Sequence, residues 1–461
     1  MKYSQIIILL LTIGIFGFKN TKPASRPNII YIMADDLGYG DLSCYGQKKF
    51  RTPYLDQMAK EGIRYTDYHS GSTVCAPSRC ALMTGKHMGH AYIRGNGEVP
   101  LRDEDYTVAE YFKQNGYHTG IFGKWGLGQA ENAGSPEKQG WDEFLGYTNH
   151  VHAHHFYTNN LWVIKGGKTV QLPIDSMRHS HLYVMDAAFD FIKNNQAKPF
   201  FMYLAITMPH AEVFAPTPES ITPFLTTDKM SAFPEIPFVQ KAGNYRSQAQ
   251  PRANFAGMVT HLDRDMGRLM DLLKSLNLSE NTYVFFTSDN GPHQEGGADP
   301  VFFDSNGPLK GIKRDMYEGG IRVPLIAWGG KVKKGLINTD VLANWDFFPT
   351  AAELTGGRKP LNLDGISFAN SLKGKPLKKK HESLYWEFYE RGFDQAVRLG
   401  DEWKAVKLSA KGGKLELYNL RTDLGEENDV AAIYPKIVAK AEKAFAENRI
   451  ASTMWPLKKK K

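Results

Sequence analysis

The sequence predicts an α/β protein built on a doubly wound sheet, followed by a smaller antiparallel sheet near the C-terminus. Short apolar segments alternate with helical patterns over most of the 461 residues, which is typical of a sheet covered by helices on both faces. The apolar segments are continuous, as expected of strands that are buried on both faces. Beyond residue 375 the strand-like segments follow one another closely, and this change indicates a second subdomain.

The large sheet is predicted from four apolar segments. We expect strands over residues 28–34, 119–122, 200–207 and 282–287. A helix is expected over 108–115, and apolar residues with helical spacing predict a long helix over 255–273. The Pro-rich segment 208–250 is too long for an ordinary connection, so it is a candidate substrate-binding loop.

The C-terminal part has a different pattern. Closely spaced strands are expected over residues 384–388, 395–399, 403–408 and 416–420. A helix over 435–448 should pack on this antiparallel sheet. We therefore divide the chain into a large domain over 25–375 and a subdomain over 376–461.

The N-terminus indicates export. Met1 and Lys2 precede an apolar run over 6–18, which is shorter than the roughly 20 residues of a membrane-spanning helix. We predict a signal peptide over 1–24 with an open cleavage site, a secreted and periplasmic protein, and no integral membrane domain. An uncleaved membrane anchor is the alternative.

Charge and cysteine content exclude some classes of protein. The formal charge of +8 includes the tail 458–461 and fits an anionic substrate. A dense basic stripe with interleaved aromatics is absent from the sequence, so nucleic acid is not an expected partner. Three cysteines are too few for disulfides to be the main support of an exported chain of this size. Whether Cys44 and Cys80 pair is left open.

Polar residues follow the predicted strands at the points where the strands end. They are Asp35, Asp36, Lys124, His210, Asp289 and Asn290. In a doubly wound sheet, ligands bind beyond the carboxyl ends of the strands. We therefore expect these side chains to meet at one edge of the sheet and to form the functional site.

The most specific motif begins at Cys75 and reads C-x-P-S-R-x-x-x-x-T-G through Gly85. Taken alone, Cys75 and Cys80 could be a metal or redox pair, but they do not have the C-x-x-C spacing of such pairs. A buried, inert cysteine is the second interpretation. At every fixed position the motif resembles the signature of type I sulfatases, in which the cysteine is oxidised to formylglycine.

The resemblance covers residues 26–330 and is looser beyond them. It includes the segments 27–38, 116–125, 287–291 and 313–324. The chain is most similar to bacterial glycan sulfatases related to N-acetylgalactosamine-sulfatase and arylsulfatase A. The resemblance implies an alkaline-phosphatase-like α/β/α sandwich, with 25–375 as the catalytic domain. It also implies a formylglycine-generating maturation enzyme as a partner.

The same resemblance implies a metal site. Two acidic pairs match the metal-binding positions of the family, and residue 75 is a further ligand; the set is Asp35, Asp36, Cys75, Asp289 and Asn290. Carboxylate and amide oxygens are the ligands of hard divalent cations. We expect Ca²⁺, with Mg²⁺ as the alternative.

The resemblance also assigns roles in sulfate transfer. One hydroxyl of the hydrated formylglycine attacks sulfur after the metal lowers its pKa, and the second hydroxyl then expels sulfate. Arg79 would hold the hydrate, while Lys124 and Lys313 would bind sulfate oxygens. His210 would protonate the leaving alcohol, with help from Lys313.

One position departs from the family pattern. Many sulfatases carry a histidine directly after the Lys–Trp pair and use it as a base during sulfate release, but here this position is Gly126. The histidine-rich segment 149–155 is a candidate source of the missing base. We expect one of His152, His154 or His155 to contact formylglycine or sulfate; a surface loop or an adventitious metal site is the alternative.

The expected activity is hydrolysis of a sulfate ester, and the expected ester is an O-sulfate on a sugar. The aromatic content of 12% and the long loop favour a sugar, with Trp162, Trp386, Tyr389 and Arg391 as candidate contacts. The alternatives are a phosphoesterase of the same superfamily and an inactive homologue that binds sulfated glycans.

Overall fold

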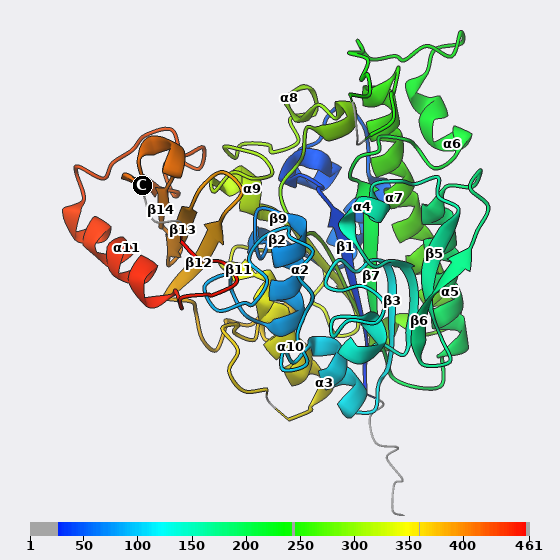
Figure 1. Ribbon diagram of the computed structural model, residues 1–461, viewed down its shortest axis with the longest axis horizontal. Helices are drawn as coiled ribbons and strands as arrows, with labels where there is room; N and C mark the ends of the chain where they lie inside the picture. The colour runs from blue at the N-terminus through cyan, green and yellow to red at the C-terminus, as the bar shows by residue number, and fades with distance from the viewer. Residues whose placement is uncertain (1–25, 242–244, 359, 458–461) are drawn as a thin grey trace, which may run out of the picture.

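The computed structural model describes residues 26–241, 245–358 and 360–457. The predicted signal peptide and the lysine tail lie outside these residues. Within the described ranges, none of the helices combines the length and the apolar character needed to cross a membrane. Figure 1 shows a large helix-covered sheet, with a smaller sheet and the last helix set to one side.

The large sheet has 11 strands and a mixed topology. Its strands are β1 (Asn28–Asp35), β2 (Ile63–His69), β3 (His118–Lys124), β4 (Glu143–Tyr147), β5 (Asn160–Lys165), β6 (Lys168–Pro173), β7 (Phe200–Pro209), β8 (Thr282–Ser288), β9 (Arg322–Gly329), β10 (Leu336–Asn338) and β11 (Leu342–Ala343). The order is β10-β2-β9-β8-β1-β7-β3-β4-β5-β6, with β11 also beside β2.

Parallel pairing places the predicted strands at the centre of the sheet. Strand β1 pairs in parallel with both β7 and β8, and β3 pairs in parallel with β7 and β4. These strands confirm the four sequence predictions, and their carboxyl ends therefore share one edge. The sheet is not wholly parallel, because β9 runs antiparallel between β8 and β2, and β5 runs antiparallel to β4 and β6.

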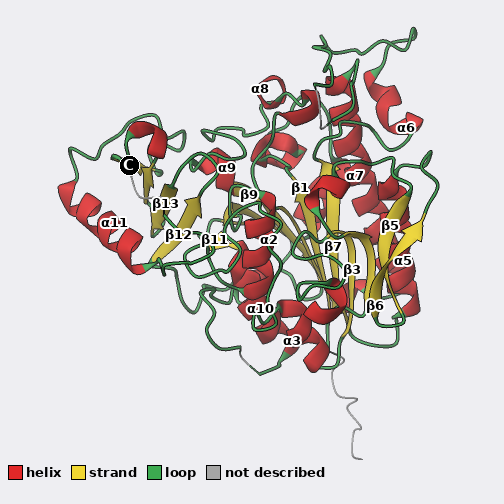
Figure 2. Cartoon of the chain, in the orientation of Figure 1, coloured by secondary structure: helices red, strands yellow, loops and turns green. Residues whose placement is uncertain are grey.

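Helices cover both faces of this sheet (Figure 2). The α-helices of the described residues are α1 (Pro53–Glu61), α2 (Cys75–Thr84), α3 (Val108–Gln114), α4 (His150–Ala153), α5 (Ser180–Asn194), α6 (Pro218–Ile221), α7 (Pro251–Ser275), α8 (Pro300–Phe303), α9 (Glu318–Ile321), α10 (Phe347–Thr355) and α11 (Pro435–Glu447). Helix α11 packs on the smaller sheet instead.

Successive side chains of β1 enter two separate cores, because neighbouring residues of a strand point to opposite faces. Tyr31 packs with residues of α2, α3 and α10, whereas Ile30 and Ile32 pack with residues of α1, α5 and α7. This arrangement confirms the α/β/α sandwich.

The C-terminal strands β12 (Ser383–Phe388), β13 (Asp394–Leu399), β14 (Trp403–Lys407) and β15 (Leu415–Asn419) form a four-stranded antiparallel sheet in sequential order. Tyr385 and Val397 pack with Phe445 of α11 on one face. Trp386 and Ala396, one position along each strand, join the core of the large sheet on the other face. The antiparallel prediction is confirmed, while the boundary between 375 and 376 stays a prediction.

The cysteines do not form disulfides in the described chain. Cys44, Cys75 and Cys80 are all free, and Cys75 and Cys80 are buried. The stability of the fold therefore rests on the two cores and on buried ion pairs.

Candidate active site

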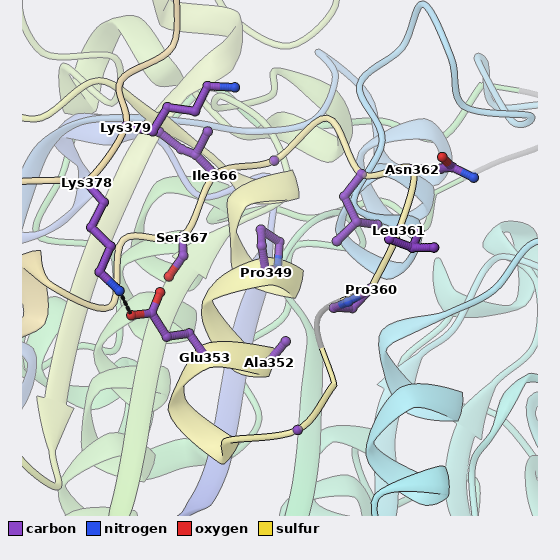
Figure 3. A pocket seen from close by; sticks show the side chains of 13 residues that line it. Pro349, Ala352, Glu353, Pro360, Leu361, Asn362, Ile366, Ser367, Lys378 and Lys379 are labelled. Carbon is purple, nitrogen blue, oxygen red and sulfur yellow. Dashed lines mark hydrogen bonds and ion pairs between the residues drawn. The ribbon is translucent and has the colours of Figure 1, made fainter.

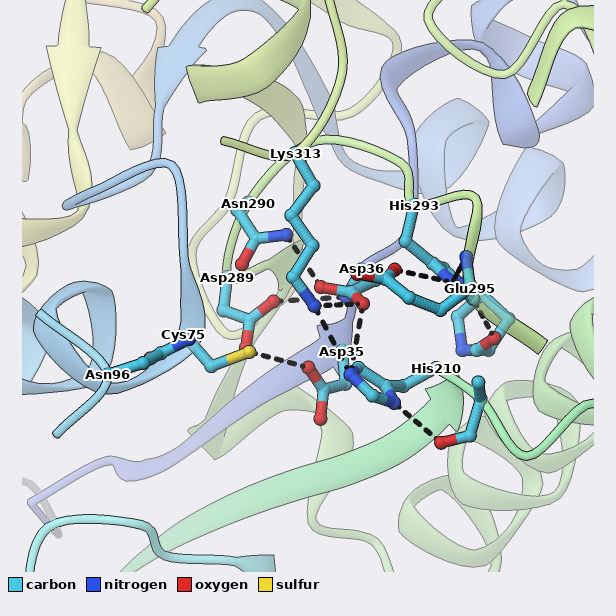
Figure 4. A network of polar contacts seen from close by, with 12 residues as sticks. Asp35, Asp36, Cys75, Asn96, His210, Asp289, Asn290, His293, Glu295 and Lys313 are labelled. Carbon is cyan, nitrogen blue, oxygen red and sulfur yellow. Dashed lines mark hydrogen bonds and ion pairs between the residues drawn. The ribbon is translucent and has the colours of Figure 1, made fainter. Parts of the chain in front are cut away.

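The carboxyl ends of β1 and β8 bring two acidic pairs together at the edge of the sheet (Figure 4). Asp35 ends β1, and Asp36 turns the chain away with a left-handed φ of 63°. The Asp289 carboxylate accepts a hydrogen bond from the backbone N–H of Asp36 at 3.0 Å. The Asn290 side-chain amide donates to Asp36 Oδ1 at 2.7 Å. All four side chains are buried.

Helix α2 supplies the candidate nucleophile from its first residue. Cys75 Sγ lies 3.4 Å from Asp35 Oδ1, and the residue is 2% exposed. Arg79 follows one helical turn later on the same face, since residues four apart lie above one another. Its guanidinium donates to Asp289 Oδ2 at 2.7 Å and to the backbone carbonyl of Lys124 at 2.8 Å. The guanidinium therefore links α2 to β8 and β3 at the site.

Two buried lysines and a histidine complete the polar cluster. Lys124, at the end of β3, donates to Asp35 Oδ2 at 2.7 Å. Lys313 donates to Asp36 Oδ2 at 2.6 Å and lies 3.2 Å from Nε2 of His210. These contacts bring together all the predicted catalytic and metal-binding residues.

Burial and charge determine the protonation of this cluster. Burial raises the pKa of the Cys75 thiol far above its usual range, and the Asp35 carboxylate adds to this effect. Burial, reinforced by the neighbouring Lys313 ammonium, holds the pKa of His210 well below its usual value, so the ring is neutral. Burial and the Asp35 charge raise the pKa of Asp289. An unmodified Cys75 is thus a protonated, weak nucleophile at neutral pH.

The oxygen-rich edge fits a hard divalent cation. Asn290 Oδ1 is buried and has no hydrogen-bond partner among the described residues, although buried amide oxygens are normally paired. One cation bound by this oxygen and the neighbouring carboxylates would satisfy it and offset the repulsion that raises the pKa of Asp289. Ligand atoms of Asp35, Asp36, Cys75 and His210 also lie close enough together to share one ion.

The histidine-rich segment contributes to the site unequally. The His154 ring stacks on His210 with centroids 4.6 Å apart and an interplanar angle of 9°. His155 Nδ1 lies 3.1 Å from the buried carboxylate of Glu212. His152 Nε2 is 3.0 Å from the Thr158 hydroxyl and is not among the residues that contact the cluster. Thus His154 alone of the three touches a predicted catalytic residue.

Three residues that were not predicted from the sequence also border the cluster: Tyr245, His293 and Glu295. The imidazole of His293 also stacks on that of His210, with ring centroids 5.4 Å apart. Nδ1 of His293 lies 3.2 Å from the Glu295 carboxylate. Tyr245 packs near both His154 and His210. His293 follows Asn290 by three residues, so proximity to the acidic pair was the only sequence signal for it.

The candidate sugar contacts differ in exposure. Trp386 is fully buried and its indole N–H donates to the Ser70 carbonyl, so it cannot contact a sugar and that prediction is wrong. Trp162 is partly buried in β5 against the main core. Tyr389 lines a hollow of about 770 Å³, and the exposed Arg391 pairs with Asp315 at 3.0 Å.

Figure 3 shows a second hollow, beside α10. Its volume is about 610 Å³, and it is lined by α10 and by residues of the segment that follows this helix, including Leu361, Ile366 and Lys378. It contains none of the predicted site residues. We assign it no role in the chemistry.

A sandwich of this kind, with carboxylates, lysines and a buried cysteine at the strand ends, defines an alkaline-phosphatase-like hydrolase of anionic esters. The profile of the Sulfatase family matches residues 27–357, and that of "N-sulphoglucosamine sulphohydrolase, C-terminal" matches 312–450. The N-acetylgalactosamine-6-sulfatase of Canis lupus familiaris is 32% identical over 436 residues, covering 86% of this chain and 74% of that protein. The chain therefore belongs to the sulfatase family, whose members are sulfuric ester hydrolases.

Other relatives agree with this placement. An arylsulfatase of Hemicentrotus pulcherrimus is 29% identical over 422 residues, covering 85% of this chain and 69% of that protein. The crystal structure of Ps i-CgsB in complex with k-i-k-neocarrahexaose matches with a TM-score of 0.77 and 27% identity, covering 94% of this chain and 96% of that chain. The likeness extends over both sheets, because it covers nearly the whole of each chain.

Proposed function

We propose that this protein removes an O-sulfate group from a sugar of a sulfated glycan, using a formylglycine made from Cys75 and a bound Ca²⁺. Mg²⁺ is the alternative cation. The observation that carries the proposal is the position of Cys75. It begins α2 beside Asp35, and the cationic side chains of Arg79, Lys124 and Lys313 lie in the same buried cluster. Formylglycine, once formed and hydrated, supplies an oxygen nucleophile that the protonated thiol is not.

The surrounding side chains fit the needs of an anionic ester. Two ammonium groups, on Lys124 and Lys313, are buried and can hold the sulfate oxygens as charge develops on them. Arg79 is anchored at both ends of its guanidinium, which suits it to orient residue 75. Nε2 of His210 lies 3.2 Å from Nζ of Lys313, and this pair of residues can deliver a proton to the leaving oxygen.

A sugar substrate is supported by the relatives and by the surface near the site. The relatives include a protein named for N-acetylgalactosamine-6-sulfate and a structure holding a carrageenan oligosaccharide. Tyr389 and Trp455, whose rings lie 5.6 Å apart, line the 770 Å³ hollow together with Glu390. Glu390 pairs with Arg314, the neighbour of Lys313, so this aromatic hollow is linked to the cluster. Aromatic rings are suitable platforms for sugar faces.

Location and maturation follow from the same proposal. The apolar N-terminal run supports export to the periplasm through a signal peptide. The conversion of a buried cysteine to an aldehyde requires a maturation enzyme that acts before or during folding, because Cys75 is only 2% exposed in the folded chain.

The test is hydrolysis of defined esters by protein expressed with a formylglycine-generating enzyme. A panel of sulfated mono- and disaccharides should release sulfate, while matched phosphate esters should react far more slowly. Mass spectrometry of the peptide containing residue 75 should show the aldehyde or its hydrate. Equal or faster phosphate release would favour a phosphoesterase, and an unmodified thiol without turnover would favour an inactive binder.

A further inference from the structure

The space in front of Gly126 is filled by another histidine, His150. A Cβ atom placed on Gly126 would lie 2.6 Å from Cε1 of His150, and 3.1 and 3.2 Å from its two ring nitrogens. These three atoms form one edge of the imidazole. The ring therefore presents both nitrogens toward the position where a side chain at residue 126 would begin.

His150 is a buried polar group without a partner. Both ring nitrogens are shielded from solvent and lack hydrogen bonds within the described part of the chain. An unpaired buried polar atom lowers the stability of the fold. An unpaired buried group of this kind calls for an explanation, and a catalytic role or a bound water or ion is the usual one. His150 is the first residue of α4, whose N-cap Asn149 accepts a hydrogen bond from His152, so its backbone is held in place.

The charged groups that act on His150 are those of the site. Burial lowers the pKa of its imidazole well below the usual range, and Lys124 and Arg79 lower it further, while Asp35 opposes them. The ring is therefore neutral at physiological pH and can accept a proton. His154, the stacking partner of His210, caps the C-terminus of the same short helix and also lowers the pKa of His150.

We propose that His150 is a catalytic base of this site, reaching from α4 into the space that residue 126 leaves open and accepting the proton released from residue 75 when sulfate departs. This inference rests on the proposed function. In that step the bond between the residue-75 carbon and the sulfate oxygen breaks, and its electron pair leaves with the sulfate dianion. The remaining hydroxyl on that carbon forms the aldehyde C=O and passes its proton to an imidazole nitrogen. Nothing is oxidised or reduced.

The first test separates sulfate release from the preceding transfer to residue 75. In mature His150→Gln, which keeps a polar side chain but not a proton acceptor near neutral pH, one equivalent of alcohol should be released per active site. Turnover should then fall by about 10²- to 10⁴-fold, and the residue-75 peptide should carry one SO₃ by mass spectrometry. His118→Gln is the control, because His118 lies at the opposite end of β3 and pairs with Glu143 on the surface.

Unchanged turnover in His150→Gln would overturn the proposal. So would an equal loss of the first alcohol release and of turnover with no sulfated peptide, which would show that His150 only positions other groups. If wild type hydrolyses no sulfate ester, the proposed function itself fails, and this result is distinct from both.

The second test uses the steric relationship and needs no maturation. Gly126→His should lower the melting temperature of the unmodified protein, because its Cβ would collide with His150. The double variant Gly126→His, His150→Ala opens the space and should regain melting temperature relative to Gly126→His. Histidine tolerates the left-handed φ of 70° at this position better than most residues. In the mature protein the double variant should also turn over faster than His150→Ala, and independent, additive effects of the two changes would contradict the shared space.

Discussion

The imidazole of His154 lies almost parallel to that of His210, with ring centroids 4.6 Å apart. This contact connects the histidine-rich segment at α4 to a residue that is itself 3.2 Å from Lys313. A second contact fixes the direction of the His210 ring: Nδ1 bonds to the backbone carbonyl of Ala211 at 2.6 Å, and Nε2 therefore faces the cluster.

Replacing His154 tests the value of this stacking. Aromatic stacking is worth about 0.5–1.5 kcal/mol, so His154→Ala should lower kcat/KM by roughly twofold to tenfold through a less well held His210. His154→Phe keeps the stacked ring and should retain most of the activity. Because the pKa of His154 is lowered to about 3, mainly by burial, its own titration should not be visible in the pH–rate profile near neutrality. Equal losses in both variants would argue against the stacking role.

Replacing Cys75 tests the nucleophile. Cys75→Ser cannot be converted to formylglycine by a cysteine-specific maturation enzyme and should lower turnover by at least about 10³-fold, as the loss of a nucleophile does. The fold should persist, because serine is of similar size. Cys80→Ala is the matched control, since Cys80 is equally buried in α2 but belongs to the hydrophobic core. Its sulfatase activity should remain, with a modest loss of stability measured by urea unfolding.

Removing the proposed cation should destabilise the protein as well as inactivate it. A ligand that binds only the folded state at about one hundred times its Kd stabilises it by about 2.7 kcal/mol. Calcium should therefore raise the melting temperature of the apoprotein. Asn290→Ala, which removes the unpaired buried oxygen, should reduce this shift. Asp263→Asn should keep it, because Asp263 is a buried carboxylate that accepts hydrogen bonds from the start of α1 instead.

The junction of the two sheets depends on a buried carboxylate. Glu318 contacts Lys404 of β14 at 2.8 Å and His69 of β2 at 3.0 Å, and both partners are fully buried. Removing one partner of such a network leaves uncompensated buried charge, so Glu318→Ala should cost about 3–5 kcal/mol of unfolding free energy. The exposed pair Arg421–Asp401 is the control, and Asp401→Ala should cost less than about 1 kcal/mol. The unfolding free energies of both variants are measured by urea unfolding and compared with that of the wild type.

Acid should destabilise the protein through buried neutral histidines. The pKa of His87 is lowered to about 4, chiefly by burial, although Asp364 opposes this shift. The unfolded chain takes up a proton near a pKa of about 6.5, while the folded chain does not. The free energy of unfolding therefore falls as the pH drops from about 6.5 to about 4. His87→Gln should show a shallower fall between about pH 7 and pH 5 in urea titrations, and an identical slope would contradict this assignment.

The local pattern of the sequence was enough to predict the central strands, the long helix α7 and the four C-terminal strands. Continuous apolar runs and helical spacing reflect burial, which local sequence records directly. It was also enough to predict that Asp35, Lys124 and Asp289 would meet, because parallel strands end at one edge of a sheet. The antiparallel strand β9 and the β5–β6 hairpin were not predictable in this way, since pairing direction depends on partners far along the chain.

Gly126 marks the limit of sequence reasoning for this protein. Its sequence context indicates a missing histidine and a nearby histidine-rich segment, from which we predict a contact by His152, His154 or His155. The structure places the ring of His150 there instead. Only the folded chain decides which ring enters the space beside Lys124. The direction of a side chain on a short helix such as α4 is set by the cap at Asn149 and by packing against β4, and no spacing along the sequence records these contacts.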